Sequence, residues 1–145
     1  MRCLALPGAV VCALAAMPAQ ADEVVITVTD LRSPEGEVRA CMTREESIFP
    51  KCIKDPASYR AVVEAGEKTV TIRFAGVKPG KYAIALLHDE NGNGKADRAL
   101  GMMPKEGYGF SRDAKVRMGP PDFEDAVFEH AAGRQELTIR MRYFL

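Results

Sequence analysis

Residues 81–97 read KYAIALLHDENGNGKAD, and this stretch decides the fold class. In its first eight residues, positions 82, 84 and 86 alternate with positions 83, 85 and 87, and all six are apolar. A period of two is typical of a β-strand, and apolar side chains on both faces place that strand inside a sheet. The remaining residues are rich in Asp, Asn and Gly, which favour loops. The stretch therefore predicts a central strand that leads directly into a polar loop.

The same alternation recurs along the chain and predicts further strands. The clearest are residues 24–31, 37–43, 68–77 and 136–143. Two weaker segments are residues 58–64, which could be a strand or a turn of helix, and residues 125–130, a strand entered from a helical turn at 121–124. Turns rich in Pro and Gly separate the segments, and none carries a long helical repeat. We therefore predict an all-β fold, an antiparallel β-sandwich of about seven strands.

One long segment, residues 88–121, contains no convincing strand and is rich in glycine. A loop of this length in a compact domain is usually functional, or packs against its own domain. Its aromatic residues are Tyr108 and Phe110 in the run EGYGFS. We expect both rings to fold back onto the sandwich as plugs; the alternative is that they line a ligand surface.

The N-terminal residues have the pattern of a secretory signal peptide. Arg2 gives a positive start, residues 4–17 form an apolar run, and Ala19-Gln20-Ala21 has the small-x-small form of a cleavage site. The run is shorter than the about 20 residues that a membrane-spanning helix needs. We expect residues 1–21 to be removed, and residues 22–145 to form a single exported domain, periplasmic or secreted, without a transmembrane segment.

Cys41 and Cys52 are the cysteines that remain once residues 1–21 are removed. In an exported chain, two cysteines this close in sequence most simply form one disulfide. Their spacing is too wide for a C-x-x-C redox pair, and no second pair supports a zinc site. The sequence therefore predicts a structural disulfide.

The charge balance leaves the class of partner open. Lys plus Arg equals Asp plus Glu, at 20 each, so no basic surplus indicates a nucleic-acid partner. No single-sign tail indicates a strongly charged partner either. The remaining candidates are a small molecule and an envelope protein.

Residues 89–97 match most of a calcium-loop pattern, D-x-[DN]-x-[DN]-G-x-x-D. The candidate ligands are Asp89, Asn91, Asn93, the carbonyl of Lys95, and Asp97. The match is incomplete, because position twelve is Leu100 rather than Glu and a strand, not a helix, enters the loop. One interpretation is a weakly bound structural Ca²⁺ ion. The other is a polar turn held by Asn and Asp hydrogen bonds without an ion.

His88, Asp89 and Glu106 support an alternative, catalytic interpretation. If the fold brings them to one open pocket, they could form a metal-dependent active site. A lone His at the end of a strand, however, more often hydrogen-bonds to the backbone. Ser111 has no G-x-S-x-G elbow around it, so the sequence carries no such hydrolase signature.

Three pieces of the chain carry a resemblance to a known family: PGKYAIALLHDENGNGKAD (79–97), GMMPKEGYGFSRDA (101–114) and GPPDFEDAVF (119–128). In these pieces the chain resembles the DUF2141 family of exported bacterial proteins, whose function is unknown. The resemblance implies a small β-sandwich of an immunoglobulin-like or prealbumin-like kind, and no particular enzyme activity. The segment from Cys41 to Cys52 departs from the family pattern and looks like an added, stapled loop.

Together these observations predict a non-catalytic binding or scaffolding module with its working surface around residues 88–111. The predicted ligand-binding residues are His88, Glu106, Tyr108, Phe110 and Ser111. Any Ca²⁺ ion would be structural and would fix the loop that precedes the two aromatic residues.

Overall fold

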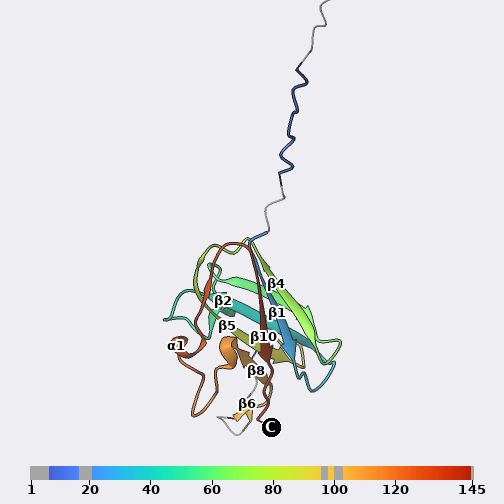
Figure 1. The fold of residues 1–145 in the computed structure, drawn as a ribbon. Coiled ribbons are helices and arrows are strands. Elements are labelled where there is room, and N and C mark those ends of the chain that lie inside the picture. Colours follow the sequence, from blue (N-terminus) through green and yellow to red (C-terminus); the bar gives the residue numbers. More distant parts are fainter. Residues whose placement is uncertain (1–6, 17–20, 96–97, 100–102, 145) are drawn as a thin grey trace, which may run out of the picture.

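The computed structural model of the chain describes residues 7–16, 21–95, 98–99 and 103–144, and its strands form two packed β-sheets and one small hairpin (Figure 1). The strands are β1 Glu23–Thr29, β2 Glu37–Thr43, β3 Tyr59–Glu64, β4 Val70–Ala75, β5 Gly80–Asp89, β6 Arg98–Ala99, β7 Met103–Pro104, β8 Gly107–Phe110, β9 Phe128–His130 and β10 Arg134–Arg140. The helical segments are the 3-10 turns η1 Cys52–Lys54 and η2 Ser111–Asp113, and the single helical turn α1 Phe123–Ala126. The predicted all-β sandwich is confirmed.

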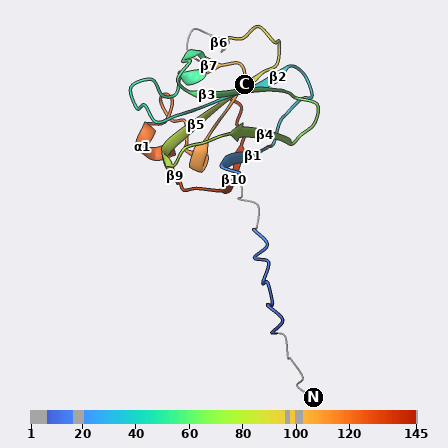
Figure 2. The same ribbon diagram turned by 90° about the horizontal axis from the view of Figure 1, so that it is seen from above.

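The two sheets differ in size and lie on opposite sides of the core (Figure 2). One has the strand order β10-β1-β4, and the other has the order β3-β2-β5-β8, with β9 pairing with the first residues of β5. β6 and β7 form a small hairpin between β5 and β8. Tyr108 of β8 and Arg142 exchange two backbone hydrogen bonds of 2.9 Å, which tie the larger sheet to the chain beyond β10.

The smaller sheet is not purely antiparallel, which corrects that part of the prediction. β1 pairs antiparallel with β4 but parallel with β10. Alternation in a sequence reveals which side chains of a strand share a face, but not the direction of the neighbouring strand. Val24, Ile26 and Val28 face the core whichever way β10 runs, and all three are completely buried.

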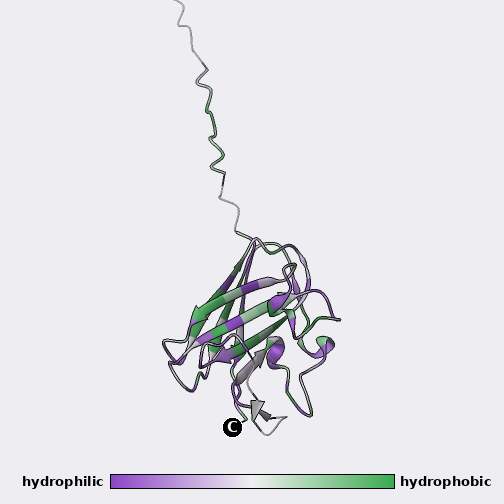
Figure 3. Cartoon of the chain, turned by 180° about the vertical axis from the view of Figure 1, so that it is seen from behind, coloured by the Kyte–Doolittle hydropathy of each residue, from purple (hydrophilic) through white to green (hydrophobic). Residues whose placement is uncertain are grey.

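The main core lies between the sheets and consists of the inward positions that the alternation predicted. Along the strands, hydrophobic residues alternate with hydrophilic ones (Figure 3). The largest completely buried apolar side chains come from both sheets: Ile26, Ile72 and Ile139 from the smaller one, and Met42, Ile84 and Leu86 from the larger.

A second apolar cluster covers part of the outer face of the larger sheet. It is centred on Cys41, Ala85 and Phe110, which point away from the main core. Cys41 forms the predicted disulfide with Cys52, with the two Cα atoms 5.6 Å apart. The disulfide holds the loop after β2 over this face, where the Phe49 ring packs edge-on against the Phe110 ring at 6.0 Å.

The prediction that residues 88–121 contain no strand is wrong. β8 pairs antiparallel with the end of β5, with Gly107 opposite His88 and Phe110 opposite Ala85. Half of β8 is glycine, which has a low strand propensity, so its four residues, GYGF, do not show the apolar–polar alternation that marks a strand. Gly109 is required there, because a Cβ would lie 2.9 Å from Cγ2 of Ile139. Of the weaker predicted segments, residues 58–64 form β3 and residues 125–130 contain β9, whereas the helical turn begins at Phe123.

Residues 7–16 extend away from the sandwich without helix or strand (Figure 1). Arg2 and Ala19-Gln20, on which the signal-peptide prediction depends, lie outside the described residues. In the part of the chain that the structure describes, no helix has the length and apolar character needed to cross a membrane. The predicted boundary after residue 21 stays a prediction.

Candidate functional site

His88 lies near the end of β5 with its ring pointing into the core, and it is completely buried. Its Nε2 atom is 2.8 Å from the carbonyl oxygen of Glu35, and its Nδ1 atom is 2.6 Å from the hydroxyl of Tyr143. A carbonyl oxygen can only accept, so Nε2 donates to it, and in the neutral imidazole Nδ1 then accepts from the Tyr143 hydroxyl. Both ring nitrogens are therefore occupied by structural hydrogen bonds.

Asp89 follows His88 directly, but its side chain points to the outer face of the sheet, since successive residues of a strand face opposite ways. The carboxylate is completely buried. Its Oδ2 atom accepts from the N–H of Gly94 at 2.6 Å and from Nε of Arg39 at 3.2 Å, and Oδ1 accepts from the N–H of Asn93 at 3.3 Å. The strand geometry therefore keeps His88 and Asp89 from facing one centre.

The loop after Asp89 is held by hydrogen bonds from its own backbone. The Oδ1 atom of Asn91 accepts from the N–H of Asn93 at 3.2 Å, and the Oδ1 atom of Asn93 accepts from the N–H of Lys95 at 2.8 Å. Gly94 has a φ of 75°, which favours glycine. These are Asx-type turns, in which side-chain oxygens replace backbone acceptors.

The calcium prediction stays a prediction. Asp97 and Leu100 lie outside the described residues, so the donor set cannot be completed from the structure. Of the described donors, Asp89 already has the Arg39 guanidinium beside it, which supplies the positive charge that an ion would otherwise bring. Within the described ranges, no three His, Cys, Asp or Glu side chains come together in a group that could hold a metal.

A charged cluster at the same end of the sandwich was not anticipated from the sequence. Arg32 forms an ion pair with Glu90, donates to the carbonyl oxygen of Lys105 at 2.8 Å and lies 4.5 Å from the centre of the Tyr143 ring. Partial burial would raise the pKa of Glu90, but hydrogen bonds from Arg32 and Ser33 outweigh it and hold that pKa below its ordinary value. The cluster joins parts of the chain that are far apart in sequence.

Glu106 is buried beside this cluster. The pKa of Arg32 is raised mainly by its hydrogen bond to Glu90, with a smaller contribution from the negative charge of Glu106. Tyr143, which accepts from the Arg32 backbone N–H at 3.2 Å, has its pKa raised by burial. Glu106 therefore lies within electrostatic reach of Arg32 and is buried rather than open to solvent.

Phe110 and Ser111 are buried, and their contacts are internal. Phe110 packs into the outer apolar cluster, as expected for a plug, and its ring stacks on that of Tyr108 at 6.4 Å. The Ser111 hydroxyl accepts from the N–H of Ile84 at 2.9 Å and donates to the carbonyl oxygen of Ala126 at 2.5 Å. Ser111 therefore continues the hydrogen-bond ladder where β8 ends, and of these three residues Tyr108 alone keeps partial exposure.

Residues 26–138 match the family model of an uncharacterized protein conserved in bacteria (DUF2141). The chain belongs to the DUF2141 family. The match runs from β1 into β10 and so takes in nearly all of the sandwich of this DUF2141 protein. No curated protein and no solved structure matches the chain significantly.

One surface feature of this DUF2141 protein was missed by sequence reasoning. Val62, Arg39, Leu87 and Tyr108 are neighbours at one level across β3, β2, β5 and β8, and all four point outward. We call these four residues the outer row. Val62 is 49% exposed, and the other three are partly exposed. The outward phase of each strand could have identified them, but the order of the strands was needed to place them side by side.

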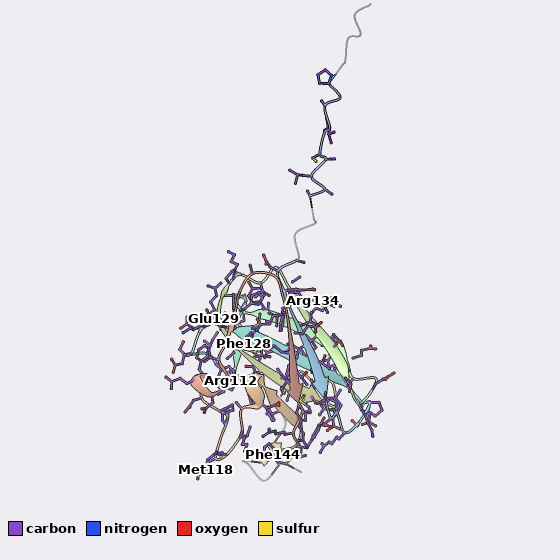
Figure 4. All side chains as sticks on the ribbon, in the orientation of Figure 1. Arg112, Met118, Phe128, Glu129, Arg134 and Phe144 are labelled. Carbon is purple, nitrogen blue, oxygen red and sulfur yellow. A yellow bond between two sulfur atoms is a disulfide. The ribbon has the colours of Figure 1, made fainter. Side chains whose placement is uncertain are left out.

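The described surface also contains two open depressions lined by loops. The larger, of about 550 Å³, lies among residues 113–125 beside the exposed Met118 (Figure 4). The smaller, of about 350 Å³, lies between Pro34, Glu37, Glu64 and Gly92. None of the predicted ligand-binding residues lines either depression.

Proposed function

We propose that this DUF2141 protein is an exported, non-enzymatic module that binds another envelope protein through its outer row. One observation carries the proposal. The polar groups that suggest chemistry in the sequence, His88, Asp89 and Ser111, are buried and hydrogen-bonded inside the fold, whereas the outer row of three apolar or aromatic side chains and one Arg keeps exposure at the surface. Aromatic, apolar and Arg side chains that lie together on one face are typical of the centres of protein interfaces.

A protein partner fits this surface better than a small molecule does. Small-molecule sites are concave and enclose most of the ligand, but the outer row lies across the face of a sheet. The centres of protein interfaces are enriched in aromatic residues and Arg, and the outer row contains Tyr108 and Arg39. Arg39 is also fixed in place by its ion pairs with Glu37 and Asp89, so its ordering adds little cost on binding.

Export is supported by the Cys41–Cys52 disulfide, because disulfides persist mainly in oxidising compartments. Export also fits the apolar run and the small-x-small motif at the N-terminus. The two arguments are independent, since one comes from the sandwich and the other from the leader.

The proposal is tested by native size-exclusion of the tagged protein in envelope extracts of its own bacterium. We expect the protein to elute in a complex larger than the purified chain. Leu87→Asp places a charge in the outer row and should return the protein to its own size, and the milder Leu87→Thr should weaken the complex. Thr71→Asp, at an exposed position of β4 in the other sheet, should leave the complex intact. Elution of the wild type at its own size, or equal loss in both Asp variants, would contradict the proposal.

A further inference from the structure

β3 is an edge strand, and one of its sides is open. The strand order places it at the end of the larger sheet; among the described strands its backbone pairs with β2 and with no other, and β4 of the smaller sheet lies next to it. Edge strands present unpaired backbone N–H and C=O groups, and proteins commonly block such edges with Pro, a bulge or a covering loop. β3 has the sequence YRAVVE and pairs in an unbroken register along its whole length, so it carries neither Pro nor bulge.

The register shows which backbone groups of β3 are open. Just past the strand, the N–H of Ala65 donates to the carbonyl oxygen of Gly36 at 3.1 Å, and hydrogen-bonded pairs alternate along an antiparallel ladder. Residues 59, 61 and 63 therefore bond to β2, and Arg60, Val62 and Glu64 direct their N–H and C=O groups to the open side. When the same alternation of hydrogen-bonded pairs is followed across β2 and β5, the N–H of Ile84 is expected to point toward β8. It does so, and the hydroxyl of Ser111 accepts it.

The side chains of these three residues are exposed and form a charge pattern that matches its own reverse. Arg60 lies at one end, Glu64 at the other and Val62 midway, all on the outer face. When two copies of this strand run antiparallel, each Arg60 therefore lies opposite a Glu64. Glu64 lies directly opposite Glu37, whose carboxylate is ion-paired with Arg39, and Glu64 itself makes no ion pair with another described residue. Opposite charges directly across a strand pair are stabilising, so a cation arriving from the open side would pair favourably with Glu64.

We propose that the open edge of β3 pairs antiparallel with β3 of a second copy of this chain, about a two-fold axis at Val62. Val62 then lies opposite Val62 of the second copy, where the two residues exchange backbone hydrogen bonds. Arg60 lies opposite Glu64 of the second copy, and Glu64 lies opposite its Arg60. The contact is isologous, since the same patch serves both subunits, and the paired edges close each other off.

This dimer is weak and depends on concentration, because one strand pair buries less than about 1,200 Å², at the low end of protein interfaces. It also joins the two larger sheets into one and brings two outer rows onto a continuous face. The inference does not rest on the proposed function, because it concerns the edge of the sheet and needs no other protein.

The test is sedimentation velocity of the purified, disulfide-bonded chain over a concentration series. Arg60→Glu and Glu64→Arg each place like charges opposite one another, and each should raise the dimer dissociation constant by about tenfold or more. The double variant with both substitutions regains complementary pairs and should regain the dimer. An equimolar mixture of the two single variants should form a heterodimer, because one edge is then wholly acidic and the other wholly basic.

Val62→Pro provides an independent variant. It removes the N–H that bonds to the second copy, on the side of the strand where Pro is tolerated, and should leave a folded monomer. Thermal melts of all variants check that the monomer is intact. A wild type that stays monomeric at every concentration would overturn the inference. So would a dimer that the single charge reversals leave unchanged, or one that neither the double variant nor the mixture restores.

Discussion

His88 is held between the Glu35 carbonyl and the Tyr143 hydroxyl, and Tyr143 is itself enclosed by its neighbours. Arg32 lies over the Tyr143 ring, and a Cβ added at Gly107 would overlap that ring. At the residue scale, these contacts give His88 a structural role. They fasten the end of the chain, beyond β10, to the turn between β1 and β2.

His88→Leu should lower the free energy of unfolding by roughly 2–4 kcal/mol, because it leaves a buried carbonyl and a buried hydroxyl without their partner. Tyr143→Phe removes the hydroxyl that bonds to His88 and accepts from the Arg32 N–H, and should cost about 1–2 kcal/mol. Urea denaturation measures both, with Glu129→Gln as the control at an exposed position (Figure 4). A loss at His88 no larger than that of the control would show that these contacts carry no stability.

Tyr143 and Tyr82 should make the fold sensitive to alkali. Burial raises the pKa of both phenols above the ordinary value. In the unfolded chain they ionise near their ordinary pKa of about 10, while the folded chain keeps them protonated, so the unfolded state is favoured as they ionise. Their contribution to stability is therefore complete below about pH 10 and declines as the pH rises through the folded-state pKa values.

The measurement is the free energy of unfolding from urea titrations on both sides of the ordinary tyrosine pKa. Tyr143→Phe removes one of the two phenols and should make the alkaline decline shallower. An equally steep decline in this variant would assign the effect to other groups.

At the scale of elements, the loop after β5 is the place where two interpretations still differ. In the structure, Asp89, Asn91 and Asn93 accept backbone N–H groups, and Arg39 supplies a positive charge beside Asp89. The calcium hypothesis predicts a higher melting temperature with Ca²⁺ than with chelator or Mg²⁺. It also predicts a larger Ca²⁺-dependent rise in Arg39→Gln, because the competing guanidinium is gone. If the wild type and Arg39→Gln each melt at the same temperature in Ca²⁺ as in chelator, the loop is a hydrogen-bonded turn without an ion.

The loop after β2, which the Cys41–Cys52 disulfide closes, is a second element whose role can be tested. It covers Phe110 and Ala85 on the outer face, and the disulfide closes it across 11 positions in sequence. Cys41→Ala with Cys52→Ala should lower the free energy of unfolding by about 2–4 kcal/mol. Reductant should destabilise the wild type by a similar amount and leave the double variant unchanged. A reductant effect in the double variant would point to a cause other than this disulfide.

At the scale of the whole molecule, the sequence predicted which residues form strands and which side of each strand is buried. It predicted less well which strands lie next to each other. Alternation identified β1, β2, β4, β5 and β10 and their core faces, because burial on one side of a strand leaves a period of two. It could not reveal the parallel pairing of β1 with β10, which depends on the path of the chain. It missed β8, whose glycines are dictated by Ile139 and Tyr143, residues distant in sequence.

In the candidate site too, contacts between residues close in sequence could be predicted, and contacts between distant residues could not. The polar loop and its turns could be read locally, because Asx-type hydrogen bonds join residues two positions apart. The roles of His88 and Ser111 could not, since their partners lie 53 and 27 residues away. The outer row needed the strand order of the larger sheet. The fold thus uses its chemically suggestive residues for hydrogen bonds of its own, which is why we propose that recognition takes place on the face of the larger sheet.

The proposed binding role of the outer row is tested most directly by site-specific photo-crosslinking in the native bacterium. A benzophenone amino acid is placed at Leu87 in the outer row and, as a matched control, at Thr71 on the outer face of β4. The account predicts a discrete adduct with one envelope protein from Leu87 and none from Thr71. No adduct from Leu87, or the same adducts from both positions, would contradict it.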